Sequence, residues 1–156
     1  DTGFSLGVGS VKTDDEAKMF IDLGASFIVS PFLDKSIAKV CVKNNIPWIP
    51  GCGTLTEMIT AEKLGAEVVK LFPGGVFGPK FISSVLEPCP WIKIMPTGGV
   101  TADFDNISEW FHAGAYCLGM GSKLISKEYL KDNDFDGLEK HILQLMKKIE
   151  MARKNA

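Results

Sequence analysis

Residues 67–75 read EVVKLFPGG, and they place a lysine inside what is otherwise the sequence of a buried strand. The run VVKLF is rich in β-branched and aromatic residues, and the PGG that follows it predicts a turn. Because side chains alternate between the two faces of a strand, Lys70 shares a face with Val68 and Phe72. Burying an ammonium group there is costly without a partner or a lowered pKa. Either Lys70 reaches water, or its burial serves its chemistry.

The bulk composition predicts one globular domain. The chain has 156 residues, of which 46% are hydrophobic and 10% aromatic, and its formal net charge is −2. Seventeen Lys and Arg balance nineteen Asp and Glu without forming a basic stripe, so neither nucleic acid nor a membrane surface is indicated as a partner. A small molecule is the expected ligand.

No targeting, membrane or metal-binding pattern is visible. The longest apolar runs are shorter than the roughly 18–20 residues of a membrane span, and the opening DTGFSLGVGS lacks the features of a signal peptide. We therefore expect a cytoplasmic protein. The four cysteines, Cys41, Cys52, Cys89 and Cys117, form no CxxC pair and lie far from both histidines, so reduced thiols and no metal site are expected.

Six apolar runs alternate with amphipathic stretches along the chain. The runs are SLGVG, FIVSP, IPWIPG, EVVKLFP, IKIMPTGG and YCLGMG. Strands of this kind, separated by helices of about ten residues, indicate an α/β fold with a parallel sheet. Thr13 and a Thr54/Glu57 capping box predict helix starts, and residues 135–153 have the spacing of a packed C-terminal helix. Gly24, Gly65 and Gly114 are expected just after helix ends.

Two later loops carry glycines and a hydroxyl. PTGGVT at 96–101 places Gly98 and Gly99 between a strand and a helix expected to begin at Thr101-Ala102-Asp103. LGMGSKL at 118–124 places Gly121 and Ser122 at another expected helix start. Backbone amides in such loops bind phosphate well, although a glycine pair after a strand is more often only a tight turn. In eightfold (β/α)8 TIM barrels, phosphate sites are frequently built from the loops after strands seven and eight. These two loops follow the last two expected strands.

The position of these two glycine loops after the last two strands predicts a partial barrel. If the last two strands are numbers seven and eight, the six visible units are strands three to eight, and residues 1–156 form a single partial TIM-barrel domain. Lys70 then lies on strand six at the face where barrel active sites collect. A desolvated lysine can attack a ketone and form a Schiff base, as in class I aldolases. An ion-paired or snorkelling lysine is an equally good interpretation of the position alone.

With EVVKLFPGG, PTGGVT and LGMGS in this order, the chain resembles the class I aldolases of 2-keto-3-deoxy-6-phosphogluconate (KDPG), which are often also active on 4-hydroxy-2-oxoglutarate (KHG). The resemblance runs from end to end. GVGSV at 7–11, SPFLD at 30–34 and IPWIPGCGTLTE at 46–57 are similar to the family's third, fourth and fifth strand motifs. The implied reactions release pyruvate, with glyceraldehyde 3-phosphate from KDPG and glyoxylate from KHG.

The resemblance also implies roles for individual residues. Lys70 would form the Schiff base with Phe72 beside it, and Thr97 would hold the keto acid end of the substrate. Ser10, where many members have threonine, would lie near the carboxylate, and Pro31 would line the pocket. The expected phosphate ligands are Gly98, Gly99, Gly121 and Ser122. No cofactor or metal is implied, and members are usually homotrimers.

The family's acid/base glutamate and a substrate-binding arginine belong to the first two βα units, so we expect them upstream of Asp1 and expect the chain to be a fragment. Glu57 could offer a substitute carboxylate, but capping is its expected role. Two other hypotheses stay open. One is a phosphate-binding barrel isomerase or synthase in which Lys70 only supplies charge, and the other is a non-catalytic fragment.

Overall fold

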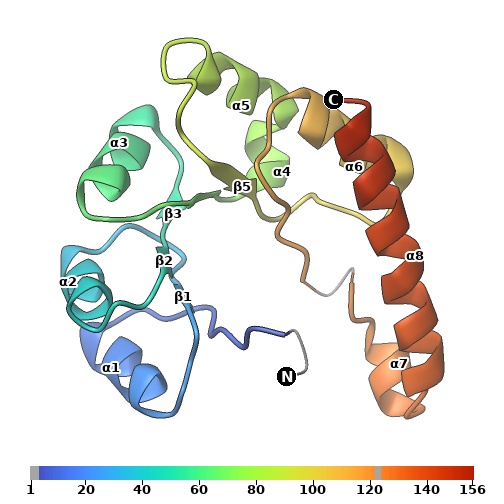
Figure 1. Cartoon of the computed structure of the whole chain (residues 1–156), viewed down its shortest axis with the longest axis horizontal. Helices are drawn as coiled ribbons and strands as arrows, with labels where there is room; N and C mark the ends of the chain where they lie inside the picture. The colour runs from blue at the N-terminus through green and yellow to red at the C-terminus, as the bar shows by residue number, and fades with distance from the viewer. Residues whose placement is uncertain (1–3, 122–123) are drawn as a thin grey trace. The chain divides into compact units, whose positions relative to one another are not determined.

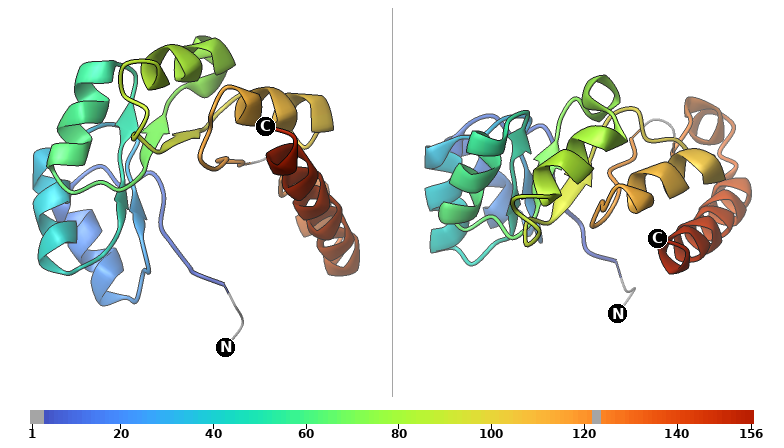
Figure 2. Two further views of the ribbon diagram at one scale, coloured as in Figure 1. Left: turned by 45° about the horizontal axis from the view of Figure 1, so that its top comes forward. Right: turned by 90° about the horizontal axis from the view of Figure 1, so that it is seen from above.

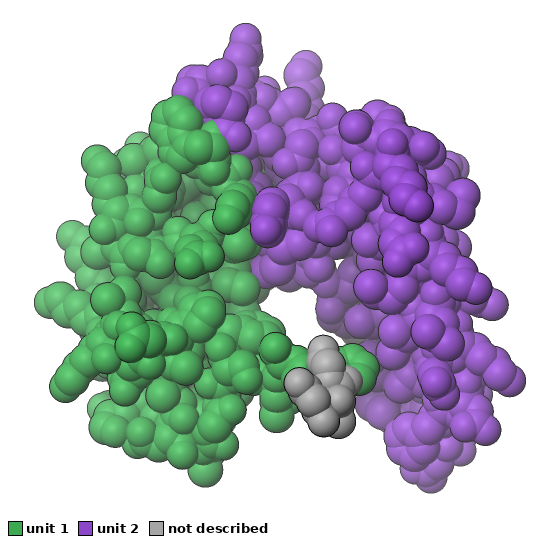
Figure 3. Space-filling view, in the orientation of Figure 1, with its two compact units in different colours: residues 1–72, 91–93 green, residues 73–90, 94–156 purple. Residues whose placement is uncertain are grey.

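Parallel strands alternate with helices in the structure, so the expected α/β class is confirmed (Figure 1). The computed structural model describes residues 4–121 and 124–156. These residues form two units (Figure 3). Unit 1 contains the described residues up to Phe72 together with Trp91–Lys93, and unit 2 contains Pro73–Pro90 and the described residues from Ile94 onward.

Unit 1 contains short parallel strands and three helices. Its elements are α1 (Asp14–Asp22), β1 (Ile28–Val29), α2 (Lys35–Lys43), β2 (Trp48–Ile49), β3 (Gly51–Cys52), α3 (Leu55–Lys63) and β4 (Val69–Leu71). β1 pairs with β2, and β3 pairs with β4 in a register that places Gly51 opposite Lys70. The helices α1 and α2 lie side by side (Figures 1 and 2).

Two of the expected strands in unit 1 differ from the prediction. IPWIPG forms β2 and β3 rather than one strand, because Pro50 between them has no N–H to donate to a ladder. The neighbouring Gly51 amide donates instead to the Ser30 carbonyl at 3.0 Å. SLGVG is reduced to a single parallel bridge between Val8 and Ile28. Ser10, with φ +62°, turns the backbone out of the extended conformation directly after it.

The predicted helix ends are confirmed. The Thr13 hydroxyl accepts from the Glu16 amide at 3.1 Å and caps α1. At α3 the Thr54 hydroxyl accepts from the Glu57 amide at 3.2 Å, and the Glu57 carboxylate accepts in return from the Thr54 hydroxyl at 2.8 Å. Gly24, Gly65 and Gly114 all follow helix C-caps with φ between +94° and +96°, a conformation that favours glycine.

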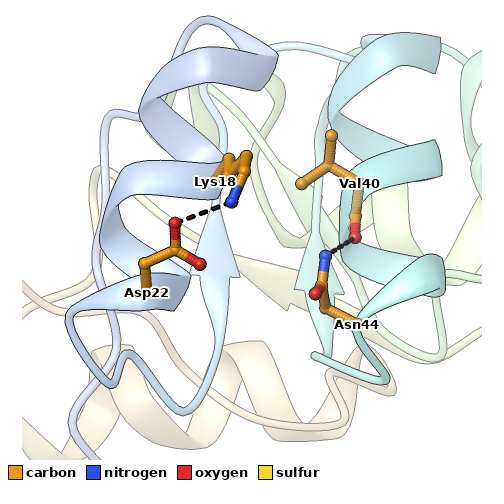
Figure 4. A network of polar contacts seen from close by, with 4 residues as sticks. All are labelled: Lys18, Asp22, Val40 and Asn44. Carbon is orange, nitrogen blue, oxygen red and sulfur yellow. Dashed lines mark hydrogen bonds and ion pairs between the residues drawn. The ribbon is translucent and has the colours of Figure 1, made fainter.

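The exposed faces of α1 and α2 carry local polar contacts (Figure 4). Lys18 Nζ pairs with Asp22 at 2.7 Å along α1. The Asn44 side chain donates to the Val40 carbonyl at 2.8 Å at the end of α2. Each contact joins residues four positions apart, so each stabilises only its own helix.

Unit 2 is mainly helical. Its elements are α4 (Gly74–Phe77), α5 (Pro79–Leu86), β5 (Ile94–Pro96), α6 (Phe104–His112), α7 (Lys127–Lys131) and α8 (Phe135–Lys154). The predicted C-terminal helix is confirmed as α8, whereas α4 and α7 were not expected. The expected strand YCLGMG is reduced to one bridge between Thr97 and Gly119.

One core cluster of unit 2 lies between α6 and α8, which run side by side (Figures 1 and 2). Ile107 and Phe111 of α6 are buried in the same cluster as Leu145 and Ala152 of α8. Arg153 at the end of α8 lies with its guanidinium 5.2 Å from the centre of the Phe111 ring. None of the described helices is both long and apolar enough to cross a membrane.

The capping box of α3 gives a stability prediction. Replacing Thr54→Ala leaves the Glu57 amide without its acceptor, so the free energy of unfolding should fall by about 1 kcal/mol. The matched control is Thr60→Ala in the same helix, because among the described residues the Thr60 hydroxyl bonds only to the Thr56 carbonyl one turn before it. That change should leave stability unchanged or slightly raised. Equal losses for the two variants in urea unfolding would contradict the capping role.

Candidate active site

Lys70 lies at the centre of β4, half-buried between buried Val69 and Leu71. Its amide donates to the Pro50 carbonyl at 2.8 Å, which fixes the strand position of the residue. Its ammonium nitrogen lies 4.6 Å from the centre of the Phe72 ring, the residue expected beside it. Within the described residues, Lys70 Nζ has no hydrogen bond and no ion pair. Among the described residues, Lys70 is therefore not an ion-paired lysine.

Burial without an anionic partner affects the protonation of Lys70. Desolvation lowers the pKa of the Lys70 side chain below its ordinary value. The contact with the electron-rich face of Phe72 favours the ammonium form, but Phe72 is 41% exposed and such a contact is weak at a wet site. Desolvation is the dominant effect, so Lys70 presents a neutral amine at lower pH than an exposed lysine does.

Pro31 lies over Gly51, the β3 residue that pairs with Lys70. A Cβ on Gly51 would collide with the Pro31 carbonyl, so the two backbones approach too closely for any side chain at Gly51. Because Gly51 is in register with Lys70, this approach is on the face toward which Lys70 points. The structure thus brings Pro31 and Lys70 to one face of the β3–β4 pair.

Ser30, which is not among the predicted site residues, holds the turn that contains Pro31. Its side chain is completely buried. The Ser30 hydroxyl donates to the Phe32 carbonyl at 2.7 Å and accepts from the Trp48 indole N–H at 3.0 Å. A serine within the apolar run FIVSP was the available signal, because a buried hydroxyl needs partners.

Ser10 is exposed and has the left-handed backbone described above. The next residue, Val11, is buried, and its amide donates to the Val29 carbonyl at 3.2 Å. Ser10 is therefore held from its C-terminal side in a conformation that is uncommon for serine. No described side chain bonds to its hydroxyl, which leaves that group available to a ligand.

In unit 2, the turn that follows β4 in the chain packs backbone to backbone against the PTGG loop. The Gly74 amide donates to the Thr97 carbonyl at 2.8 Å. A Cβ on Gly74 would lie 2.7 Å from the Gly98 carbonyl oxygen, and a Cβ on Gly99 would lie 2.5 Å from the Gly75 Cα. Neither distance is tolerated by a real side chain, so glycine is required at both positions.

Thr97 makes two backbone contacts. It accepts from Gly74 and it forms the β-bridge with Gly119. A Cβ on Gly119 would collide with the Thr97 hydroxyl, so the hydroxyl occupies the space that a larger residue would take. Thr97 Oγ1 is buried and has no hydrogen-bond partner among the described residues. A buried hydroxyl without a partner is costly and is suited to a ligand that bonds to it.

Gly98 and Gly99 have φ of +83° and +77°, which glycine adopts at little cost. Neither amide donates to an acceptor within residues 4–121 and 124–156. Two adjacent free N–H groups in a turn are a suitable anion-binding element.

The helix expected to begin at Thr101-Ala102-Asp103 is confirmed as α6, whose N-cap is Asp103. α6 begins at Phe104, and its first residues include the acidic Asp103 cap and Asp105. Carboxylates at this helix start disfavour an anion at the helix end.

The second glycine loop is only partly described. Gly121 is exposed, and its carbonyl accepts from the Leu124 amide at 2.8 Å. Among the residues described after Gly121, the first helix is α7, which begins at Lys127. Ser122, the other expected phosphate ligand in this loop, lies outside the described residues.

Glu57 acts in capping, as expected. Its carboxylate accepts from the Gly53 amide at 2.9 Å and from the Thr54 hydroxyl. The Gly53 bond and then the Thr54 bond hold the pKa of Glu57 below its ordinary value, so the group is a poor proton acceptor near neutral pH.

The cysteines are free thiols. Burial raises the pKa of Cys41 to about 11 and that of Cys52 to about 12, which keeps both protonated and unreactive. Among the described residues, no group of three or more His, Cys, Asp or Glu side chains is placed to hold a metal ion.

Comparison with known proteins identifies a family for this chain. Residues 2–141 match the family model described as KDPG and KHG aldolase. The chain is 32% identical over 120 residues to a 2-dehydro-3-deoxy-6-phosphogalactonate aldolase of Escherichia coli (strain K12), covering 76% of this chain and 58% of that protein. It is 30% identical over 146 residues to a 2-dehydro-3-deoxy-phosphogluconate aldolase of Treponema pallidum (strain Nichols), covering 90% of this chain and 68% of that protein.

Among solved structures, the one titled "Native KDPGal structure" is similar to this chain with a TM-score of 0.80 at 27% identity. The match covers 97% of this chain and 69% of that one. The chain thus spans between roughly three fifths and seven tenths of the length of these three relatives. Because the family model covers nine tenths of its residues, the chain belongs to the KDPG and KHG aldolase family.

Proposed function

We propose that this chain carries the Schiff-base chemistry of a class I aldolase acting on a phosphorylated 2-keto-3-deoxy sugar acid. The products are pyruvate and glyceraldehyde 3-phosphate, and KHG, which gives pyruvate and glyoxylate, is a second substrate. The observation that carries this proposal is Lys70, a half-buried strand lysine without an ionic partner among the described residues and with a lowered pKa. The names of the relatives support this substrate class, one naming the galactonate and one the gluconate sugar acid.

The proposed reaction uses Lys70 as the nucleophile. The neutral amine attacks the C2 ketone, and loss of water from the carbinolamine gives a protonated imine. Loss of the proton from the C4 hydroxyl then breaks the C3–C4 bond, whose electron pair moves to the iminium nitrogen. This step releases the aldehyde and leaves an enamine on Lys70. Protonation at C3 and hydrolysis release pyruvate and restore the amine.

The remaining described residues bind the two ends of the substrate. By the family resemblance, the Thr97 hydroxyl, which has no partner among the described residues, is assigned to the keto acid end, Ser10 to the carboxylate and Pro31 to the lining of the substrate site. The free amides of Gly98 and Gly99 bind the phosphate, together with Gly121. Ser122 is the fourth proposed phosphate ligand and lies outside the described residues. Glu57 is occupied in its capping box, so no described carboxylate is assigned to the proton transfers.

We also propose that the six βα units correspond to strands three to eight of an eight-stranded (β/α)8 barrel. The order of the motifs supports this numbering, as does the match of nearly the whole chain to about seven tenths of a related aldolase chain. In this numbering the Gly98 and Gly121 loops follow strands seven and eight, where barrels often bind phosphate. A homotrimer in the cytoplasm is the assembly and location that fit the family.

Trapping with pyruvate tests the imine. Borohydride reduction in the presence of pyruvate should add one reduced pyruvate to the peptide that contains Lys70, detected by mass spectrometry. Lys70→Arg should abolish the adduct, because a guanidinium keeps the charge but does not form the imine. The matched control is Lys80→Arg on α5, which makes the same exchange at an exposed lysine and should leave trapping unchanged.

An adduct that persists in Lys70→Arg would rule out the assigned nucleophile. No adduct on the unaltered chain, combined with phosphate binding, would favour the alternative of a phosphate-binding isomerase or synthase, in which Lys70 supplies only charge.

The lowered pKa gives an independent prediction. In the folded chain, reductive methylation of Lys70 should reach half of its maximum rate at a lower pH than in urea, where the midpoint should lie near the ordinary lysine value of about 10.4. The midpoint is lower in the folded chain because burial disfavours the ammonium form of Lys70, which therefore loses its proton at lower pH. Peptide mass spectrometry at each pH measures the midpoint, and a folded midpoint equal to or above the unfolded one would contradict the desolvation argument.

A further inference from the structure

The PTGG loop is fixed by a side chain that has no assigned role. Asn106, in the first turn of α6, reaches back across the loop with both ends of its amide group. Its Oδ1 accepts from the Thr101 amide at 2.8 Å, and its Nδ2 donates to the Gly99 carbonyl at 3.4 Å. One amide group therefore fixes the peptide on each side of Val100.

Apart from the backbone contact of Gly98 and Gly99 with Gly74 and Gly75, the described residues make few other bonds to this stretch. Gly98 and Gly99 both adopt positive φ, and neither N–H is used within the described residues. The Thr101 hydroxyl and Asp103 bond to each other, with the hydroxyl 2.9 Å from the carboxylate, so they organise only the helix start. Lys148 of α8 donates to the Ala102 carbonyl at 2.9 Å, which fixes the far end of the segment. Asn106 alone among the described side chains bonds to the Gly99 peptide.

We infer that Asn106 is a positioning residue for anion binding by this loop. By holding the Gly99 carbonyl and the Thr101 amide, it fixes the two flexible glycines with their N–H groups unpaired and available to a phosphate. This inference rests on the proposed phosphate role of Gly98 and Gly99. A neutral amide is needed, because one side chain must both donate and accept. A carboxylate at position 106 would keep the acceptor, lose the donor and add a negative charge beside Asp103 and Asp105.

The two hydrogen bonds of Asn106 predict how its variants rank in phosphate affinity. Asn106→Ala removes both bonds, so binding of inorganic phosphate should weaken about fivefold. Asn106→Asp keeps the stronger bond to Thr101 and should fold at least as well as Asn106→Ala, yet it should bind phosphate more weakly still, because its charge repels the anion. If Asn106 only stabilised the fold, Asn106→Asp would bind phosphate more tightly than Asn106→Ala.

The test is a titration of the ¹⁵N-labelled full chain with inorganic phosphate, followed by NMR at the Gly98 and Gly99 amides. Thermal unfolding of each variant is measured beside it, together with borohydride trapping of pyruvate at Lys70, which should change by less than about twofold. Asn44→Ala is the matched control, because it removes another asparagine side-chain bond to a backbone carbonyl at the end of α2 (Figure 4). This control should leave phosphate binding unchanged.

Unaltered phosphate affinity in both Asn106 variants would overturn the positioning role while leaving the phosphate site intact. Absence of phosphate-dependent shifts at Gly98 and Gly99 in the unaltered chain would overturn the phosphate site and this inference together. In either case the trapping result still reports on the imine at Lys70, so the failure of the proposed nucleophile is recognised separately.

Discussion

The close approach of two glycine turns is the constraint on which the candidate phosphate loop depends. Gly74 and Gly75 lie so near Gly98 and Gly99 that a Cβ on Gly74 or Gly99 would collide with the opposing backbone. This contact brings the Gly74 amide onto the Thr97 carbonyl. It also leaves the Gly98 and Gly99 amides without acceptors among the described residues. The Gly98 and Gly99 amides are thus a candidate anion-binding element that uses backbone groups and no charged side chain.

The candidate nucleophile depends on a different physical effect, the cost of desolvating a cation. Lys70 is bonded into β4 through its backbone, while its side chain has an aromatic ring beside it and no described anion. An exposed lysine is almost wholly protonated at neutral pH and is a poor nucleophile. Partial burial shifts the balance toward the amine, and the strand holds that amine in place.

The sequence predicted the class of the fold and the helices well, because these depend on local signals. Thr13, Thr54 and Gly65 mark helix ends through bonds and backbone angles formed within a few residues, and the structure confirms them. The strands were predicted less well. Pro50 interrupts one, and the first and last expected strands are each reduced to a single bridge, because strand extent depends on pairing with distant segments.

Residues whose importance lies in a backbone contact were the hardest to predict. Ser30 and Asn106 act by bonding to carbonyl and amide groups, and the sequence does not show where those groups lie. Asparagine is a poor helix former, so its presence in the first turn of α6 was a weak hint of a local bond. Lys70 was recognisable, because a charge in an apolar strand conflicts with its surroundings.

The most direct test of this account is a crystal structure of the chain reduced with borohydride in the presence of pyruvate and soaked in inorganic phosphate. The account predicts continuous density from Lys70 Nζ to the C2 atom of pyruvate, and a phosphate on the Gly98 and Gly99 amides. An unmodified Lys70 beside an adduct on another lysine, or a phosphate bound elsewhere with the two glycine amides empty, would contradict it.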